Sequence, residues 1–166
     1  MKTRFITLGG ILTALSIILV YLSVIIPTSK LYLLALASMV IPVVIIMTNI
    51  RYGLLVYIST AILSLLLIGL VWNVVIYILF FGAYAFIKYL IERLNNLPLE
   101  YVMKYIFYNG SLILIYLFYK VFLFPLPQIK LPIYFIVILL EVIFLFYDYF
   151  LTIFITYINK RLKIKI

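Results

Sequence analysis

Two acidic residues lie deep inside a long apolar run of this chain, and they are the side chains best placed to do chemistry. Glu141 and Asp148 are seven positions apart in that run. Seven residues make close to two turns of an α-helix, so both carboxylates are expected on one helix face, about 10 Å apart. A carboxylate that faces lipid is destabilising by a few kcal/mol or more, so this face should point into the protein. The pair therefore predicts either a substrate or ion pathway or a set of structural ion pairs.

The structural alternative depends on lysines at matching depth. Lys120 falls near the same end of its apolar run as Glu141, and Lys88 falls near the same end as Asp148. Each lysine could neutralise one carboxylate inside the membrane without any ligand. Both interpretations stay open, and a small ion or proton carrier that uses only the two carboxylates is a third.

Aromatic and amide side chains add candidates for contact with a ligand. The chain has 16 tyrosine and 13 phenylalanine residues, and anchoring at the membrane interface explains many of them. A few lie within the apolar runs, where they could stack on a planar ligand. The candidate substrate contacts are Glu141, Lys120, Tyr116, Asn73 and Tyr147.

Several kinds of chemistry find no support in this sequence. Histidine and cysteine are both absent, which removes the commonest general base and the commonest soft metal ligands. There is no phosphate-binding glycine loop, no HExxH and no Gly-x-Ser-x-Gly motif. We therefore expect no enzyme activity, no cofactor and no metal site.

The elements that would position these residues are long and apolar. Hydrophobic residues make up 69% of the chain and charged residues 10%, whereas soluble domains are about half apolar and a quarter charged. The runs do not alternate apolar and polar residues as barrel strands do, so they predict helices. Each is close to the length that crosses about 30 Å of hydrocarbon. The expected spans of this single membrane domain, 1–166, are 5–26, 31–48, 53–70, 72–90, 105–124 and 131–158.

The charges between the runs predict the topology. With the N-terminus inside, most lysine and arginine residues fall in inside segments, and only Lys30 and Lys130 fall in outside loops. This distribution obeys the positive-inside rule. We therefore expect an all-α, six-transmembrane-helix bundle in the cell membrane with both termini cytoplasmic. The alternative is five spans, with 31–48 or 53–70 re-entrant. Residues 97–104 predict a short interfacial helix before the fifth span.

Small residues on the first span predict contact with another helix. Gly10 and Ala14 are four residues apart, as are Gly9 and Thr13, and small residues at this spacing let helices approach closely. The partner helix could belong to this chain or to a separate membrane subunit. The net charge of +9 comes from residues at helix ends, so anionic lipid headgroups are a better match for it than nucleic acid.

The first seventy residues resemble the substrate-binding (S) components of energy-coupling factor transporters. The resemblance is carried by Thr3–Leu15 (TRFITLGGILTAL), by the proline-bearing Ile41–Met47 (IPVVIIM) and by Asn49–Tyr57 (NIRYGLLVY). Family members often have a longer first outer loop than Pro27–Lys30 of this chain.

The resemblance implies a function and a set of partners. The chain would capture a vitamin or other micronutrient on the outer side. Its first helix would dock, through Gly9, Gly10, Thr13 and Ala14, against a transmembrane coupling subunit and, through it, ATPase subunits. The rod-shape membrane protein MreD has a similar size and helix count, and it implies a non-catalytic scaffold of cell-envelope synthesis instead.

Overall fold

The computed structural model describes residues 2–94, 96–122 and 133–163 of the chain, and these residues are helical throughout except for short turns. No strand occurs among them, which confirms the all-α prediction. The expected link around Lys130, the first two residues of the expected sixth span and the end of the basic tail lie outside the described residues.

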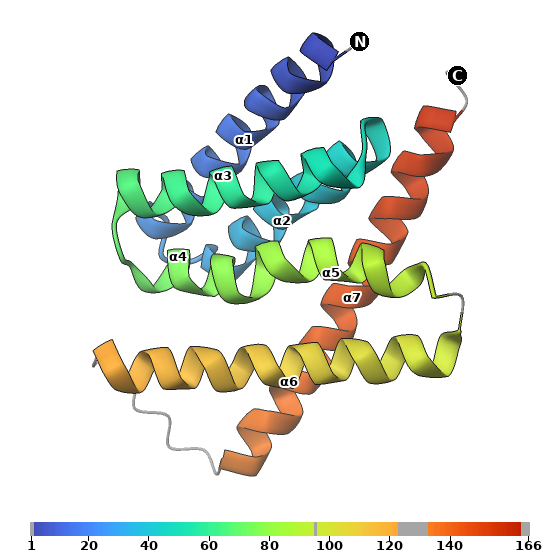
Figure 1. Ribbon diagram of the computed structural model, residues 1–166. Helices are drawn as coiled ribbons and strands as arrows, with labels where there is room; N and C mark the ends of the chain where they lie inside the picture. The colour runs from blue at the N-terminus through green and yellow to red at the C-terminus, as the bar shows by residue number, and fades with distance from the viewer. Residues whose placement is uncertain (1, 95, 123–132, 164–166) are drawn as a thin grey trace. The chain divides into compact units, whose positions relative to one another are not determined.

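Eight helical segments follow one another in this part of the chain, and Figure 1 shows their course. In chain order they are α1 (Lys2–Ile25), α2 (Lys30–Met47), α3 (Ile50–Ile68), α4 (Trp72–Ile76), η1 (Tyr77–Gly82), α5 (Ala83–Glu92), α6 (Leu97–Phe122) and α7 (Ile133–Lys163). The segment η1 is a π-helical turn that joins α4 to α5 as one continuous rod.

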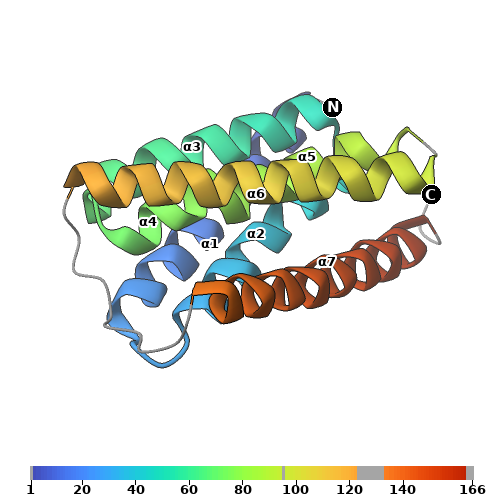
Figure 2. The same ribbon diagram turned by 90° about the horizontal axis from the view of Figure 1, so that it is seen from below.

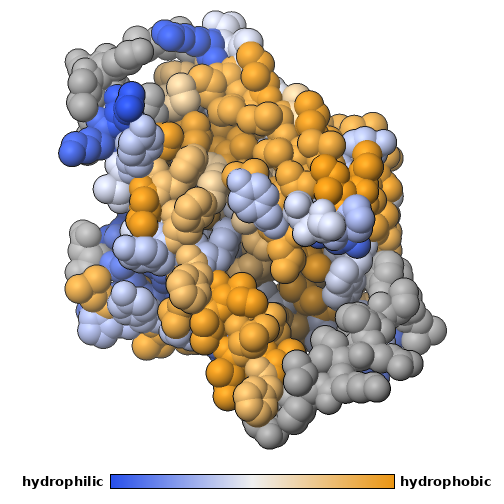
Figure 3. All heavy atoms as spheres, turned by 180° about the vertical axis from the view of Figure 1, so that it is seen from behind, coloured by the Kyte–Doolittle hydropathy of each residue, from blue (hydrophilic) through white to orange (hydrophobic). Residues whose placement is uncertain are grey.

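Six helices among the described residues are long and apolar enough to cross a membrane. Leucine, isoleucine and other large apolar side chains are exposed along most of these helices, whereas α2 and the span Trp72–Glu92 expose them only near their ends. Figure 3 shows wide areas of such side chains on the surface. Exposed apolar area on this scale is unstable in water and stable in lipid. The chain is therefore a multi-pass membrane protein.

The helix bounds agree with the predicted spans within a few residues, with one correction. The expected interfacial helix at 97–104 is not separate, because α6 runs without interruption from Leu97 to Phe122. The segment 97–104 has no glycine and no internal break, so it continues straight into the apolar run. Both α2 and α3 are continuous helices of 18 and 19 residues, which favours six spans over the five-span alternative.

The chain divides into two compact units, Met1–Ile115 and Tyr116–Ile166. In the first unit, α1 packs against α2 and α3, and α2 also packs against η1 and α5. Figure 2 gives a second view of the same helices. The helix α2 lies at the centre of this unit, and most of its middle is buried, Pro42 included. The second unit contains the end of α6 and α7.

Two glycines allow close contacts in the first unit. A Cβ atom at Gly53 of α3 would overlap the side chain of Ile45 on α2. A Cβ atom at Gly82 would come within 2.8 Å of the Tyr57 ring, and the hydroxyl of Tyr57 donates to the Ile78 carbonyl at 2.9 Å. Glycine at these two positions therefore lets α3 lie against both α2 and the π-helical turn.

The turns that separate the first four helices are short and have local causes. The side chain of Asn49 accepts a hydrogen bond from the backbone N–H of Ile50 at 2.7 Å and caps the start of α3. Gly69 ends α3 with a φ of 88°, a conformation that glycine adopts without strain. This turn places Trp72 at the start of α4.

Candidate functional site

The four small residues of α1 divide between two faces of the helix. Gly9 and Thr13 are buried, and a Cβ atom at Gly9 would lie 3.6 Å from Cγ2 of Val56 on α3. Gly10 and Ala14 are exposed, and no atom lies within 4 Å of a Cβ atom built at Gly10. The two predicted uses of this motif, packing within the chain and contact with a separate subunit, thus apply to different residues. Gly9 and Thr13 serve packing within the chain, whereas Gly10 and Ala14 leave an open, small-residue face, which we call the α1 outer face.

Asn73, a predicted substrate contact, is only 6% exposed and lies at the start of α4. Its amide nitrogen donates to the carbonyl and to the hydroxyl of Ser23 near the end of α1, the latter at 3.2 Å. An amide with two buried acceptors holds the two helix ends together. Its role in this structure is to join α1 to α4, and contact with a substrate stays a prediction.

A group of buried hydroxyls lies deeper in the first unit. Ser16 of α1, Thr60 and Ser64 of α3, and Tyr77 of η1 are fully buried. The side-chain hydroxyls of Ser16 and Thr60 are neighbours of the Tyr77 hydroxyl. Among the described residues, however, none of these four hydroxyls has a hydrogen-bond partner of good geometry. We call the four residues the hydroxyl cluster.

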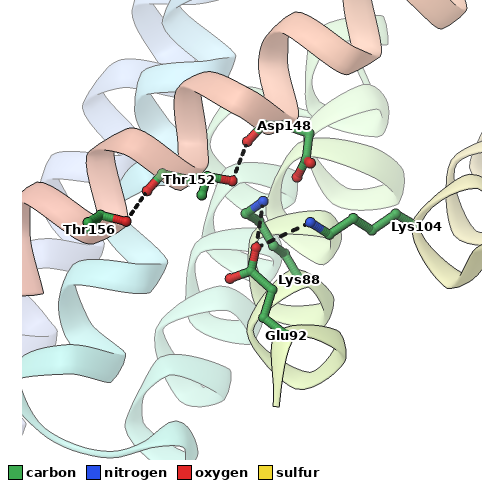
Figure 4. Close-up of polar contacts among 6 residues, drawn as sticks. All are labelled: Lys88, Glu92, Lys104, Asp148, Thr152 and Thr156. Carbon is green, nitrogen blue, oxygen red and sulfur yellow. Dashed lines mark hydrogen bonds and ion pairs between the residues drawn. The ribbon is translucent and has the colours of Figure 1, made fainter. Parts of the chain in front are cut away.

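Lys88, predicted as an intramembrane charge, belongs to an ionic group at the other end of the same rod. Its ammonium lies 2.9 Å from a carboxylate oxygen of Glu92, one turn further along α5. Lys104 of α6 lies 3.2 Å from the same oxygen. Figure 4 shows the two lysines converging on Glu92. Both lysines are buried, at 0% and 6% exposed, while Glu92 keeps some access to solvent. The group ties α5 to α6 across the turn between them.

Aromatic rings join η1 and α5 to α6 further along. Phe80 contacts Tyr108 edge to face with centroids 5.6 Å apart, and Tyr84 stacks on Phe107 at 6.0 Å. Such pairs contribute about 0.5–1.5 kcal/mol each beyond their buried area. These ionic and aromatic contacts hold the start of α6 in the first unit.

The remaining candidates lie in the second unit. Glu141, Tyr147 and Asp148 are on α7, and the two carboxylates share a helix face as their spacing predicts. The hydroxyl of Thr152 donates to the backbone carbonyl of Asp148 at 2.9 Å, and that of Thr156 donates to the carbonyl of Thr152 (Figure 4).

The other two predicted substrate contacts, Tyr116 and Lys120, are exposed on α6, one turn apart. Whether these residues contact one ligand together with Glu141 stays a prediction. Among the described residues, no group of three or more acidic side chains gathers as a metal site.

The structure points to residues that the sequence did not single out. Glu92 and Lys104 bind each other across the turn between α5 and α6, and their spacing along the chain does not predict this contact. Ser16, Thr60 and Tyr77 are spread over three helices, and nothing in their spacing along the chain connects them.

Comparison of the chain with family models, curated proteins and solved structures gives no match.

Proposed function

We propose that this chain is the substrate-binding membrane subunit of a micronutrient importer of the energy-coupling factor type. The proposal starts from the resemblance of the first seventy residues to that family. The observation that supports it best is the α1 outer face, where Gly10 and Ala14 are exposed and the space over Gly10 is open. Small residues exposed toward lipid leave room for a partner helix to approach closely.

In this proposal the two units have different tasks. The α1 outer face docks to a transmembrane coupling subunit, and ATPase subunits bound to that partner use ATP. The substrate contacts come from Glu141, Lys120, Tyr116 and Tyr147, and both chain termini lie on the cytoplasmic side of the cell membrane. A carboxylate and an ammonium together suit a ligand with polar groups of both signs.

The test of docking is a bulky substitution at the open glycine. Gly10→Leu is expected to abolish co-purification of companion membrane subunits with the tagged protein from its native membrane, because a leucine side chain keeps the partner helix at a distance. Gly110→Leu is the matched control, since a Cβ atom at Gly110 of α6 also meets open space. The docking role is wrong if the Gly10→Leu protein still brings down the same companion chains as the control.

A scaffold of cell-envelope synthesis, similar to MreD, is the second candidate. It is favoured by the mutual pairing of polar side chains in the first unit, where Asn73 binds Ser23 and two lysines bind Glu92. Native mass spectrometry of the protein pulled from its membrane separates the two candidates. A retained small molecule together with coupling and ATPase chains supports the importer, whereas envelope-synthesis proteins without a small molecule support the scaffold.

A further inference from the structure

The hydroxyl cluster differs from the other buried hydroxyls of the chain in how it is satisfied. Buried serine and threonine side chains in membrane helices usually donate to a carbonyl of the preceding turn. In the described residues the other buried members follow this rule. The donor and acceptor pairs are Thr13 to Gly9, Ser23 to Val20, Ser38 to Ala35, and Ser111 to Phe107.

Ser16, Thr60 and Ser64 do not make this local bond. Each is in a helix interior, where the carbonyl of the preceding turn is available as an acceptor. Their hydroxyls are buried instead, and those of Ser16 and Thr60 lie near the hydroxyl of Tyr77. A hydroxyl that does not bond to the available backbone carbonyl needs another partner, because a buried hydroxyl without a hydrogen bond is strongly disfavoured.

The chemistry of the cluster defines that partner. Three helical elements supply the groups, and a hydroxyl can both donate and accept a hydrogen bond. All the groups are uncharged, and an ion without an opposite charge is expensive in a membrane interior. The partner is therefore neutral and small, with several hydrogen-bonding positions, as a water molecule is.

We propose that the hydroxyl cluster is an internal water-binding site that joins α1, α3 and the π-helical turn. The water receives or donates hydrogen bonds at Ser16, Thr60 and Tyr77, with Ser64 one turn further along α3 on the same face. Its position beside η1 agrees with the general tendency of π-helical turns to occur at functional sites. This inference does not depend on the proposed function.

X-ray radiolytic labelling in lipid nanodiscs tests the site directly. Pulsed irradiation forms hydroxyl radicals from bound as well as bulk water, so a buried tyrosine is oxidised quickly only when water lies beside it. Tyr84 is the matched control, since it is also 0% exposed but packs against Phe80 and Phe107. We expect Tyr77 to be oxidised several-fold faster than Tyr84. Equal rates would show a dry cluster and overturn the proposal.

The double variant Ser16→Ala, Thr60→Val should remove the effect. With two of its partners lost, the water is expected to leave, and the oxidation rate of Tyr77 should fall to that of Tyr84. An unchanged rate at Tyr84 reports that the fold is intact. If Tyr77 is still labelled rapidly in the double variant, the water is held elsewhere and the assignment to this cluster is wrong.

Thermal unfolding gives a second, independent measurement. Removing a hydroxyl that binds water should lower the midpoint temperature, whereas removing a hydroxyl that lacks any partner should raise it. Thr60→Val is compared with Thr13→Val, whose hydroxyl is buried but bonded to its own helix. A midpoint for Thr60→Val below that of the unsubstituted protein, with a decrease comparable to that of Thr13→Val, supports the site. A midpoint equal to or higher than that of the unsubstituted protein contradicts it.

Discussion

Glu92 is the residue on which two buried lysine side chains of the first unit converge. Lys88 and Lys104 both reach the same carboxylate oxygen. Removing one partner of a buried ion pair lowers the stability of a protein more than replacing the whole pair with apolar residues does, because the remaining charge stays buried. The Glu92 side chain therefore matters through the two ammonium groups that share its negative charge.

We expect Glu92→Gln to lower the free energy of unfolding by about 1–3 kcal/mol, since two buried ammonium groups would then face a neutral amide. The measurement is denaturation of the purified protein in detergent. Glu100→Gln in the first turn of α6 is the control, and it should lose only about 0.5 kcal/mol of interaction with the helix dipole. Equal losses for the two variants would argue against a special role of Glu92.

At the scale of the helices, close contact between α2 and α3 depends on Gly53. Alanine is the better helix former by about 1 kcal/mol, so a Gly→Ala change is stabilising wherever space allows. At Gly53 the added methyl group would overlap Ile45, and forcing extra volume into a packed core is destabilising by about 1–3 kcal/mol. The steric effect should therefore exceed the gain in helix propensity.

Gly53→Ala is thus expected to lower the free energy of unfolding by about 1–2 kcal/mol in sum. Gly110→Ala, where the methyl group meets open space, should leave it unchanged or raise it slightly. Unfolding of the two variants by a denaturing detergent checks the sign of each effect. A gain in stability for Gly53→Ala would mean that α2 and α3 do not approach as closely as described.

The helices were predictable from the sequence to a greater extent than the contacts between them. Uninterrupted apolar runs and the residues between them locate the spans because lipid requires each span to be a helix of nearly fixed length. The start of α6 differs from the predicted span because its first two turns carry charges, although nothing in them ends the helix. Which of two adjacent glycines, Gly9 or Gly10, faces the interior depends on the neighbouring helix and cannot be read from spacing alone.

The hydroxyl cluster illustrates why the candidate site was harder to predict. Serine and threonine are common in membrane helices, and most satisfy themselves within their own helix. Only the packing of α3 against both α1 and the π-helical turn brings Ser16, Thr60 and Tyr77 together. The π-helical turn itself has no reliable sequence signal. Long-range packing thus determines the site, whereas local pattern determines the helices.

At the scale of the whole molecule, the central claim is a chain of six membrane spans. An even number of spans requires both chain ends to lie on one side of the membrane. The excess of lysine and arginine in the segments on the side of the N-terminus predicts that this side is cytoplasmic. The proposed function depends on this topology, because it places substrate capture on the outer side of the membrane and both chain termini on the cytoplasmic side.

The chain contains no cysteine, so single cysteines can report the topology without background. Thr3→Cys, Thr28→Cys and Lys160→Cys each replace an exposed residue, the first and last near the chain ends and the second in the turn between α1 and α2. A membrane-impermeant maleimide applied to intact cells should label only Thr28→Cys, and permeabilised cells should add the other two. Labelling of Thr3→Cys and Lys160→Cys from opposite sides would contradict six spans.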